Sequence, residues 1–291
     1  MLQLVRGDDS LVVAPEHGGA IVGWTRRGIH MFRRPSPEAV LNGRPGAMGC
    51  FPLVPFCNRI AWRHFNWAGR AYELAANFGD HPHAIHGVGW RVPWLVEAVS
   101  ADSVTLSLRH EVPGESARAW PFAFTAHLTY GLTTRGLTVR IDATSLHTAP
   151  VPMGIGIHPY FPCETGTAIM FQATGVWINR DALPVTHGPI PPEWSHADGR
   201  MTDHEPLDNC FTGWNGAARI PGMRIDADPV FGNLQIFTPR GANFFCVEPV
   251  SHVPGAIDRA DLAGPQAMPV LAPGQTIGGC MTLSPHNQTR F

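Results

Sequence analysis

The chain has 291 residues, of which 44% are hydrophobic and 15% are charged, and its formal net charge is −2 with histidine neutral. All 21 basic residues are arginine, and they form no long run of like charge. Neither a nucleic acid nor an anionic membrane is therefore expected as a partner. The 31 glycines and 28 prolines favour many short strands joined by turns over long helices.

The N-terminal stretch lacks the basic and apolar segments of a signal peptide, and no apolar run approaches the ~18 residues of a membrane-spanning helix. We therefore expect a cytoplasmic protein. Six cysteines, at positions 50, 57, 163, 210, 246 and 280, form no C-x-x-C pair and no zinc-finger spacing with histidine. They are expected to be reduced, mostly buried thiols.

Alternating apolar and polar residues predict half-buried antiparallel strands along much of the chain. The clearest are residues 104–108, 122–132 and 137–142, with a hairpin turn at 133–136. Further strand candidates are residues 11–14, 21–24, 234–237, 244–247 and 279–283, whereas the best helical candidate is only residues 115–120. We predict an all-β fold, a large antiparallel β-sandwich that forms a single domain over residues 1–291.

Residues 151–162, VPMGIGIHPYFP, contain one titratable group, His158. Glycines 154 and 156 leave little bulk before this histidine, and prolines 159 and 162 stiffen the chain after it. A rigid apolar turn around a structural histidine and a frame that holds a functional imidazole both fit this segment. The two glycines leave room for a ligand ring or for a facing strand.

Residues 51–62 place Asn58 and Arg59 after an apolar run punctuated by prolines. The guanidinium group is a rigid fork of donors that suits vicinal hydroxyls or a carboxylate. The alternative is a structural arginine that pairs with a surface acid.

Residues 80–90, DHPHAIHGVGW, contain His81, His83 and His86. H-x-H is a metal-ligand spacing, but no acid or cysteine stands at a matching distance in the sequence, so no metal is predicted. His86 close to Trp90 is more typical of a polar group beside an aromatic platform for a sugar.

Two further stretches place a carboxylate among apolar residues. Asp208 precedes Phe211 and Trp214 and can accept hydrogen bonds from hydroxyls, although Asp-Asn is also ordinary turn chemistry. On a strand, Cys246 and Glu248 share one face, where desolvation raises the pKa of the carboxyl and prepares it to accept a proton near neutrality. A buried glutamate without a task is costly, which favours a functional interpretation.

The sequence has no G-x-S-x-G elbow, no P-loop and no dinucleotide fingerprint. The remaining groups are a carboxylate, one or two histidines, an arginine, an aspartate and nine tryptophans. Acid–base chemistry on a small polar ligand is what these groups predict.

In order and approximate spacing, these stretches resemble the aldose 1-epimerases, the galactose mutarotase-like proteins. The matching motifs are Asn58-Arg59-Ile60, His86-Gly87 followed by Arg91-x-Pro93-Trp94, His158-Pro159-Tyr160-Phe161, Leu207-Asp208-Asn209-x-Phe211 and Val247-Glu248-Pro249. The resemblance covers almost the whole chain, from Gly18 to Gly274. Each motif is weak alone, but five in the right order form a specific match.

The resemblance implies a galactose mutarotase-like β-sandwich with an open sugar-binding cleft, and interconversion of the α and β anomers of a hexose. Glu248 matches the general base at the C1 hydroxyl, and His158 matches the general acid at the ring oxygen. Arg59, His86 and Asp208 match positions that hold hydroxyls and the ring oxygen, and Asn58 is expected to bind substrate with them. The mechanism requires no metal or organic cofactor. The expected partner is a monosaccharide, and the expected state is a monomer or homodimer.

Two alternatives remain open. One is a mutarotase for a charged sugar, such as a hexose 6-phosphate or a sulfonated hexose, with Arg63 or Arg91 at the rim of the cleft. The other is a non-catalytic sugar-binding module, against which the presence of both Glu248 and His158 argues.

Overall fold

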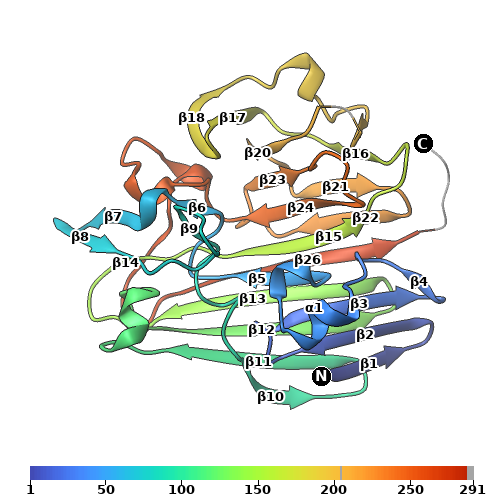
Figure 1. Ribbon diagram of the computed structural model, residues 1–291, viewed down its shortest axis with the longest axis horizontal. Coiled ribbons are helices and arrows are strands. Elements are labelled where there is room, and N and C mark those ends of the chain that lie inside the picture. Colours follow the sequence, from blue (N-terminus) through green and yellow to red (C-terminus); the bar gives the residue numbers. More distant parts are fainter. Residues whose placement is uncertain (204, 287–291) are drawn as a thin grey trace.

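The computed structural model of the chain describes residues 1–203 and 205–286. Two large antiparallel sheets, of eleven and nine strands, account for most of it, and three two-stranded sheets lie beside them (Figure 1). The prediction of an all-β antiparallel fold is confirmed. One continuous cluster of buried apolar side chains includes residues from both large sheets, such as Leu11 and Val247 in one and Leu128 and Ile141 in the other.

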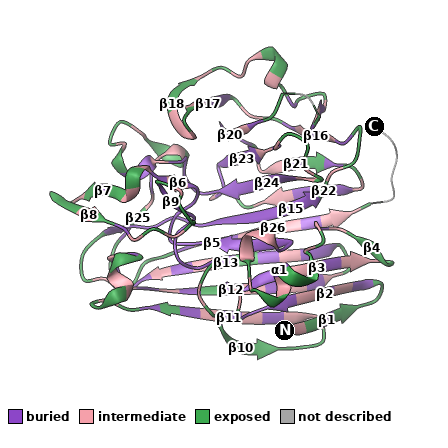
Figure 2. Cartoon of the chain, viewed as in Figure 1, coloured by how far each residue is buried: buried purple, intermediate pink, exposed green. Residues whose placement is uncertain are grey.

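The eleven-stranded sheet contains the strands of His158 and Glu248. Its order is β1 (Leu2–Arg6), β2 (Asp9–Ala14), β3 (Ala20–Arg26), β5 (Cys50–Leu53), β15 (Gly156–Pro162), β24 (Phe244–Val250), β23 (Asn233–Phe237), β20 (Asp208–Thr212), β17 (Gly175–Arg180) and β18 (Leu183–Gly188), with β4 (Ile29–His30) paired to β3. The central strands β5, β15, β24 and β23 are almost wholly buried (Figure 2).

The nine-stranded sheet follows the order β10 (Leu95–Val99), β11 (Ser103–His110), β12 (Phe124–Thr133), β13 (Gly136–Ser145), β26 (Thr276–Pro285), β22 (Met223–Ala227), β21 (Ala217–Ile220), β16 (Ala168–Phe171) and β19 (Arg200–Met201). Its strands show the predicted alternation, since every second residue of β12 is buried. Thr133 pairs with Gly136, so the predicted hairpin between β12 and β13 closes through a two-residue turn.

The three small sheets pair β6 (Arg59–Ile60) with β9 (Ala84–Ile85), β7 (His64–Trp67) with β8 (Arg70–Glu73), and β14 (Val151–Pro152) with β25 (Val270–Leu271). The helices are short: α1 (Pro37–Leu41) and the 3₁₀ turns η1 (Pro45–Ala47), η2 (Ala61–Arg63), η3 (Glu115–Arg118), η4 (Pro192–Trp194), η5 (Ala256–Asp258) and η6 (Gly264–Gln266). The helical candidate at residues 115–120 is thus one 3₁₀ turn. Within the described part of the chain, no helix has the length and apolar character needed to cross a membrane.

The interpretation of residues 151–162 as a rigid turn is wrong, because most of the segment is the central strand β15. The ladder between β15 and β24 pairs Gly156 with Val250 and Tyr160 with Cys246, and it is interrupted between these two pairs. Proline has no N–H to donate to a neighbouring strand. Pro159 and Pro249 lie within the interruption, and they account for donors that the ladder lacks there.

Candidate active site

The register of the large sheet brings residues from distant parts of the chain into one row. The pairs on either side of the interruption place His158 of β15 opposite Glu248 of β24. On its other side Glu248 pairs with Gln235 of β23, and His158 pairs with Phe51 of β5. Four strands therefore present an imidazole, a carboxyl and an amide side by side, next to an aromatic ring.

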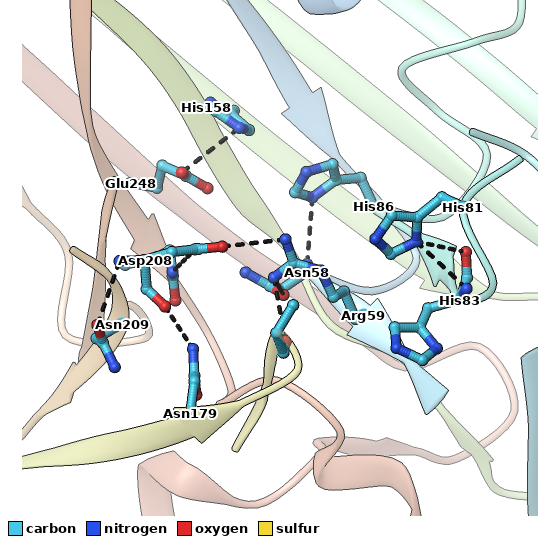
Figure 3. A network of polar contacts seen from close by, with 12 residues as sticks. Asn58, Arg59, His81, His83, His86, His158, Asn179, Asp208, Asn209 and Glu248 are labelled. Atoms are coloured by element: carbon cyan, nitrogen blue, oxygen red, sulfur yellow. Dashed lines mark hydrogen bonds and ion pairs between the residues drawn. The ribbon is translucent and has the colours of Figure 1, made fainter. Parts of the chain in front are cut away.

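His158 and Glu248 are the middle two residues of this row, and Figure 3 shows the contact between them. His158 Nε2 lies 3.4 Å from Glu248 Oε1, and the residues are 5% and 3% exposed. Burial raises the pKa of Glu248 well above its usual value, and nearby Asp208 raises it further while Arg59 lowers it. Burial lowers the pKa of His158 well below its usual value, with smaller contributions from His86 and Arg33. Both shifts favour the uncharged forms, so the pair holds one proton at rest.

Aromatic rings hold the His158 imidazole in place. The Tyr160 ring stacks on it at 4.5 Å between centroids with an interplanar angle of 5°, and Phe51 packs against it at 4.6 Å. The Arg33 guanidinium lies 3.6 Å from the centroid of Tyr160 and donates to the carbonyls of Gly46 and Met48, each at 2.8 Å. The rotation of the imidazole is therefore restricted, with Nε2 kept toward Glu248.

Arg59 and Asp208 form a second charged pair beside the first. Arg59 Nη2 donates to Asp208 Oδ2 at 3.0 Å, and Arg59 Nη1 donates to Asn58 Oδ1 at 3.1 Å. The other carboxylate oxygen of Asp208 accepts from Gln235 Nε2 at 2.7 Å. The side chains of Arg59 and Asp208 are 14% and 33% exposed, so the site is more open on this side than at His158 and Glu248.

His86 completes the group and is held as a neutral donor. Its Nδ1 accepts from the backbone N–H of Asn58 at 3.2 Å, which leaves the proton on Nε2. Burial, with a smaller contribution from Arg59, lowers the pKa of His86 to about 3. The His86 and His158 rings are 5.1 Å apart between centroids. Asn58 and His86 both have left-handed backbones, with φ of 57° and 59°, a strain that often accompanies functional sites.

His252 anchors the loop that carries Asn58 and Arg59. Its Nε2 accepts from the backbone N–H of Cys57 at 3.1 Å, while Nδ1 lies 2.8 Å from the Val253 carbonyl and donates to it. The sheet strand that carries Glu248 leads directly into this histidine. The loop with Asn58 and Arg59 is therefore held by the segment that follows β24, the strand of Glu248.

The two glycines before His158 make room for protein and not for a ligand. A Cβ on Gly154 would lie 2.2 Å from His252 Cδ2, and one on Gly156 would lie 2.7 Å from Cys57 Sγ. Of the two explanations for these glycines, room for a ligand ring and room for a facing part of the chain, the structure supports the second at both positions.

His81 and His83, the H-x-H pair, lie apart from His158 and Glu248, and a ring nitrogen of each accepts a hydrogen bond from a backbone N–H (Figure 3). His83 Nδ1 accepts from the Trp62 N–H at 2.9 Å, and His81 Nδ1 accepts from the His83 N–H at 3.2 Å. Of the cations considered for a charged sugar, Arg91 is exposed and donates to the Asn77 carbonyl. Arg63 is the last residue of η2, directly after Trp62, and has a left-handed backbone.

The structure adds residues that sequence reasoning missed. Gln235 is 1% exposed and supports Asp208, and Asn179 Nδ2 donates to the Asp208 carbonyl. Four buried polar atoms around the site have no hydrogen-bond partner among the described residues: Arg59 Nε, His158 Nδ1, Asn179 Oδ1 and Gln235 Oε1. Buried polar groups are normally satisfied, so this set suits a ligand rich in hydroxyls. The sequence marks Gln235 only as a glutamine inside the apolar run of β23, which indicates a buried amide but not its role.

A large antiparallel β-sandwich with a buried imidazole–carboxyl pair and an adjacent Arg–Asp pair defines a galactose mutarotase-like protein. The aldose 1-epimerase family model matches residues 1–291. The chain therefore belongs to the aldose 1-epimerase family, as the sequence motifs predict.

Individual relatives agree with this assignment. The chain is 31% identical over 288 residues to the uncharacterized protein YphB of Escherichia coli K12, covering 92% of this chain and 93% of the relative. It superposes with a TM-score of 0.85 on the crystal structure of an E. coli K12 protein provisionally named an aldose 1-epimerase, at 31% identity and 97% coverage of both chains. A galactose mutarotase-like protein from Clostridium acetobutylicum shares the fold, with a TM-score of 0.85, 20% identity and coverage of 98% of this chain and 95% of that one.

Proposed function

We propose that this protein interconverts the α and β anomers of a hexose by acid–base ring opening and closure. The observation that carries the proposal is the buried contact of 3.4 Å between His158 Nε2 and Glu248 Oε1. Mutarotation removes one proton from the C1 hydroxyl and delivers one to the ring oxygen. A buried pair that holds one proton supplies both functions without a net change in its own protonation.

In the proposed reaction, the Glu248 carboxylate accepts the proton of the C1 hydroxyl while protonated His158 donates to the ring oxygen. The bond between C1 and the ring oxygen breaks, and the aldehyde end rotates about the C1–C2 bond. The ring then closes on the opposite face, with the two residues in reversed roles. A sugar hydroxyl that donates to Glu248 stabilises its carboxylate form and so favours transfer of the shared proton to His158.

The groups around the pair have binding roles in this proposal. Arg59 offers donors and Asp208 offers acceptors at the more exposed side of the site, where the hydroxyls remote from C1 would lie. Neutral His86 carries a donor on Nε2 and its ring lies beside that of His158, with 5.1 Å between centroids, and Asn58 holds His86 through its backbone N–H. The sugar hydroxyls would thus accept hydrogen bonds from one charged donor, Arg59, and one neutral donor, His86.

Replacement of each member of the pair tests the proposal. Glu248→Gln and His158→Asn should each slow anomer interconversion by about two orders of magnitude or more, a loss typical of a missing general acid or base. Polarimetry on freshly dissolved α-glucose and α-galactose measures the rate, and circular dichroism checks the fold. A wild-type rate equal to that of buffer over a panel of aldoses would refute the proposal.

The chain contains a matched control for these variants. His127 Nε2 and Glu97 Oε1 lie 3.6 Å apart on the surface, with side chains 46% and 41% exposed. His127→Asn and Glu97→Gln make the same chemical changes in an exposed pair and should leave the rate unchanged.

The same measurements test the two alternative functions. Hexose 6-phosphates should be added as competitors at low salt, since a site for an anionic sugar would bind them more strongly at low ionic strength. Tight sugar binding without rate acceleration would instead identify a binding module.

A further inference from the structure

A thiol lies beside the catalytic pair and takes no part in the proposed reaction. Cys246 is two residues before Glu248 on β24, so both side chains lie on one face of the strand. One donor atom from each of His158, Cys246 and Glu248 lies within 4.8 Å of the other two, and no other such trio occurs in residues 1–203 and 205–286. All three residues are buried.

We propose that His158, Cys246 and Glu248 form an inhibitory site for a thiophilic divalent transition metal of the Zn²⁺ type. An imidazole nitrogen, a thiolate and a carboxylate are the three ligand types that Zn²⁺ takes in proteins, and three protein ligands leave a fourth position open. Donors bound to one tetrahedral zinc ion at about 2.0–2.3 Å stand roughly 3.3–3.7 Å apart. His158 Nε2 and Glu248 Oε1 already have such a separation, at 3.4 Å.

The sulfur ligand determines which metal is selected. Thiolate favours zinc, cobalt and their softer neighbours, whereas Mg²⁺ and Ca²⁺ prefer oxygen ligands only. Burial keeps the pKa of the Cys246 thiol well above its usual value, so the site carries a protonated thiol until a metal binds. Binding therefore releases the thiol proton and the proton shared by His158 and Glu248, two protons in all, and the two anions formed balance the charge of the ion.

The charged neighbours of the site neither complete it nor block it. Arg33 favours the thiolate of Cys246, and its guanidinium donates to the Gly46 and Met48 carbonyls and stacks on Tyr160. Asp208, whose carboxylate opposes ionisation of Glu248, is engaged by Arg59 and Gln235. A metal can therefore bind His158, Cys246 and Glu248 without breaking the contacts of Arg33 or Asp208.

A metal at this position would occupy the carboxylate and the imidazole that the reaction needs. Inhibition rests on the proposed function, but metal binding does not. The two are measured separately by titrating the whole protein with Co²⁺, whose thiolate complexes absorb light, and by following mutarotation in the presence of Zn²⁺.

We expect one Co²⁺ to bind per chain and to produce a thiolate-to-cobalt absorption band. Added Zn²⁺ should displace the Co²⁺ and remove the band, whereas Mg²⁺ should not. Cys246→Ala should abolish the band. Cys210→Ala, which removes another buried thiol near Glu248 but outside the trio, should retain it. Saturating Zn²⁺ should slow wild-type mutarotation at least tenfold, whereas Cys246→Ala should require at least tenfold more Zn²⁺ for the same fractional loss relative to its own metal-free rate.

Absence of the thiolate band from the wild type, or its persistence in Cys246→Ala, would overturn the proposal. If Cys246→Ala does not fold, Cys246→Ser removes the thiolate with a side chain of similar shape and serves the same comparison. A Co²⁺ band in a protein whose metal-free form has no mutarotase activity would leave the metal site standing and refute the proposed function.

Discussion

His158 and Glu248 meet across the only interruption in the ladder between β15 and β24, with Nε2 and Oε1 3.4 Å apart. Pro159 and Pro249 lie within the same interruption. The backbone thus omits hydrogen bonds at the place where the two residues that we propose as acid and base meet.

The pair should give a bell-shaped dependence of kcat/KM on pH. The active state holds one proton. On the acid side activity falls when His158, whose pKa is lowered, takes a second proton. On the alkaline side it falls when Glu248, whose pKa is raised, loses the shared proton. Rates of anomer exchange measured by NMR over a pH series would show both limbs, and a profile without an alkaline limb would contradict this assignment.

Replacing the charges beside the pair should move the alkaline limb in opposite directions. Asp208 raises the pKa of Glu248 and Arg59 lowers it. Asp208→Asn should therefore shift the alkaline limb to lower pH, and Arg59→Met should shift it to higher pH. Both variants should also raise KM about tenfold or more, because each leaves a partly buried charge unpaired. Shifts in the same direction would show that the limb does not report Glu248.

The strands were predictable because alternation is a local property of the sequence. Residues 104–108 and 137–142, for example, lie inside β11 and β13. The grouping of the site was not predictable from pattern alone, since the register of β15 against β24 depends on pairing between distant segments. The family motifs supplied what the pattern could not.

The residues that sequence reasoning missed act through contacts made between distant segments. Gln235 lies between Leu234 and Ile236, and nothing local distinguishes an amide that supports Asp208 from one that is merely tolerated. Arg33 contacts the Tyr160 ring that stacks on His158, and only the folded chain brings these residues together. The glycines before His158 were noticed, but their partners, His252 and Cys57, come from other segments.

Gly154→Ala should destabilise the fold through a clash with His252. The new Cβ would lie 2.2 Å from His252 Cδ2, and overpacking of this kind costs about 1–3 kcal/mol. The same substitution should cost less in a His252→Ala background, where the ring is gone. Gly23→Ala is the matched control, because a Cβ there meets nothing within 4 Å. Urea unfolding of the four variants and the wild type measures the difference, and equal losses in both backgrounds would exclude the clash.

His252 should also make the protein sensitive to acid. Burial lowers its pKa to about 4, from an ordinary value of 6.5. The imidazole is neutral in both states above pH 6.5, whereas between about 6.5 and 4 the unfolded chain binds a proton that the native state does not. The free energy of unfolding should therefore fall as pH falls through this range, by up to about 1.4 kcal/mol per pH unit from this residue. Urea unfolding at a series of pH values should show a shallower fall for His252→Gln, and an unchanged slope would contradict the assignment.

The turn at Trp62 and Arg63 should be a place where stability can be gained. Both residues have left-handed backbones, with φ of 51° and 66°, a conformation that costs about 1–2 kcal/mol for each residue with a Cβ and that Asn-Gly adopts readily. Trp62 is 63% exposed, so Trp62→Asn loses little buried area. Arg63 is half-buried, and Arg63→Gly loses the part of its side chain that packs on the protein. The double substitution also loses the edge contact of the indole with His83, at 5.0 Å between centroids, which is worth about 0.5–1.5 kcal/mol. The strain of the two residues, about 2–4 kcal/mol together, exceeds the losses at both positions, so the free energy of unfolding should rise by roughly 1 kcal/mol. Ala68→Asn is the control, because it creates the same Asn-Gly turn between β7 and β8 at a single strained residue. It should give a smaller gain. A double variant less stable than the wild type would show that the lost side-chain contacts outweigh the strain.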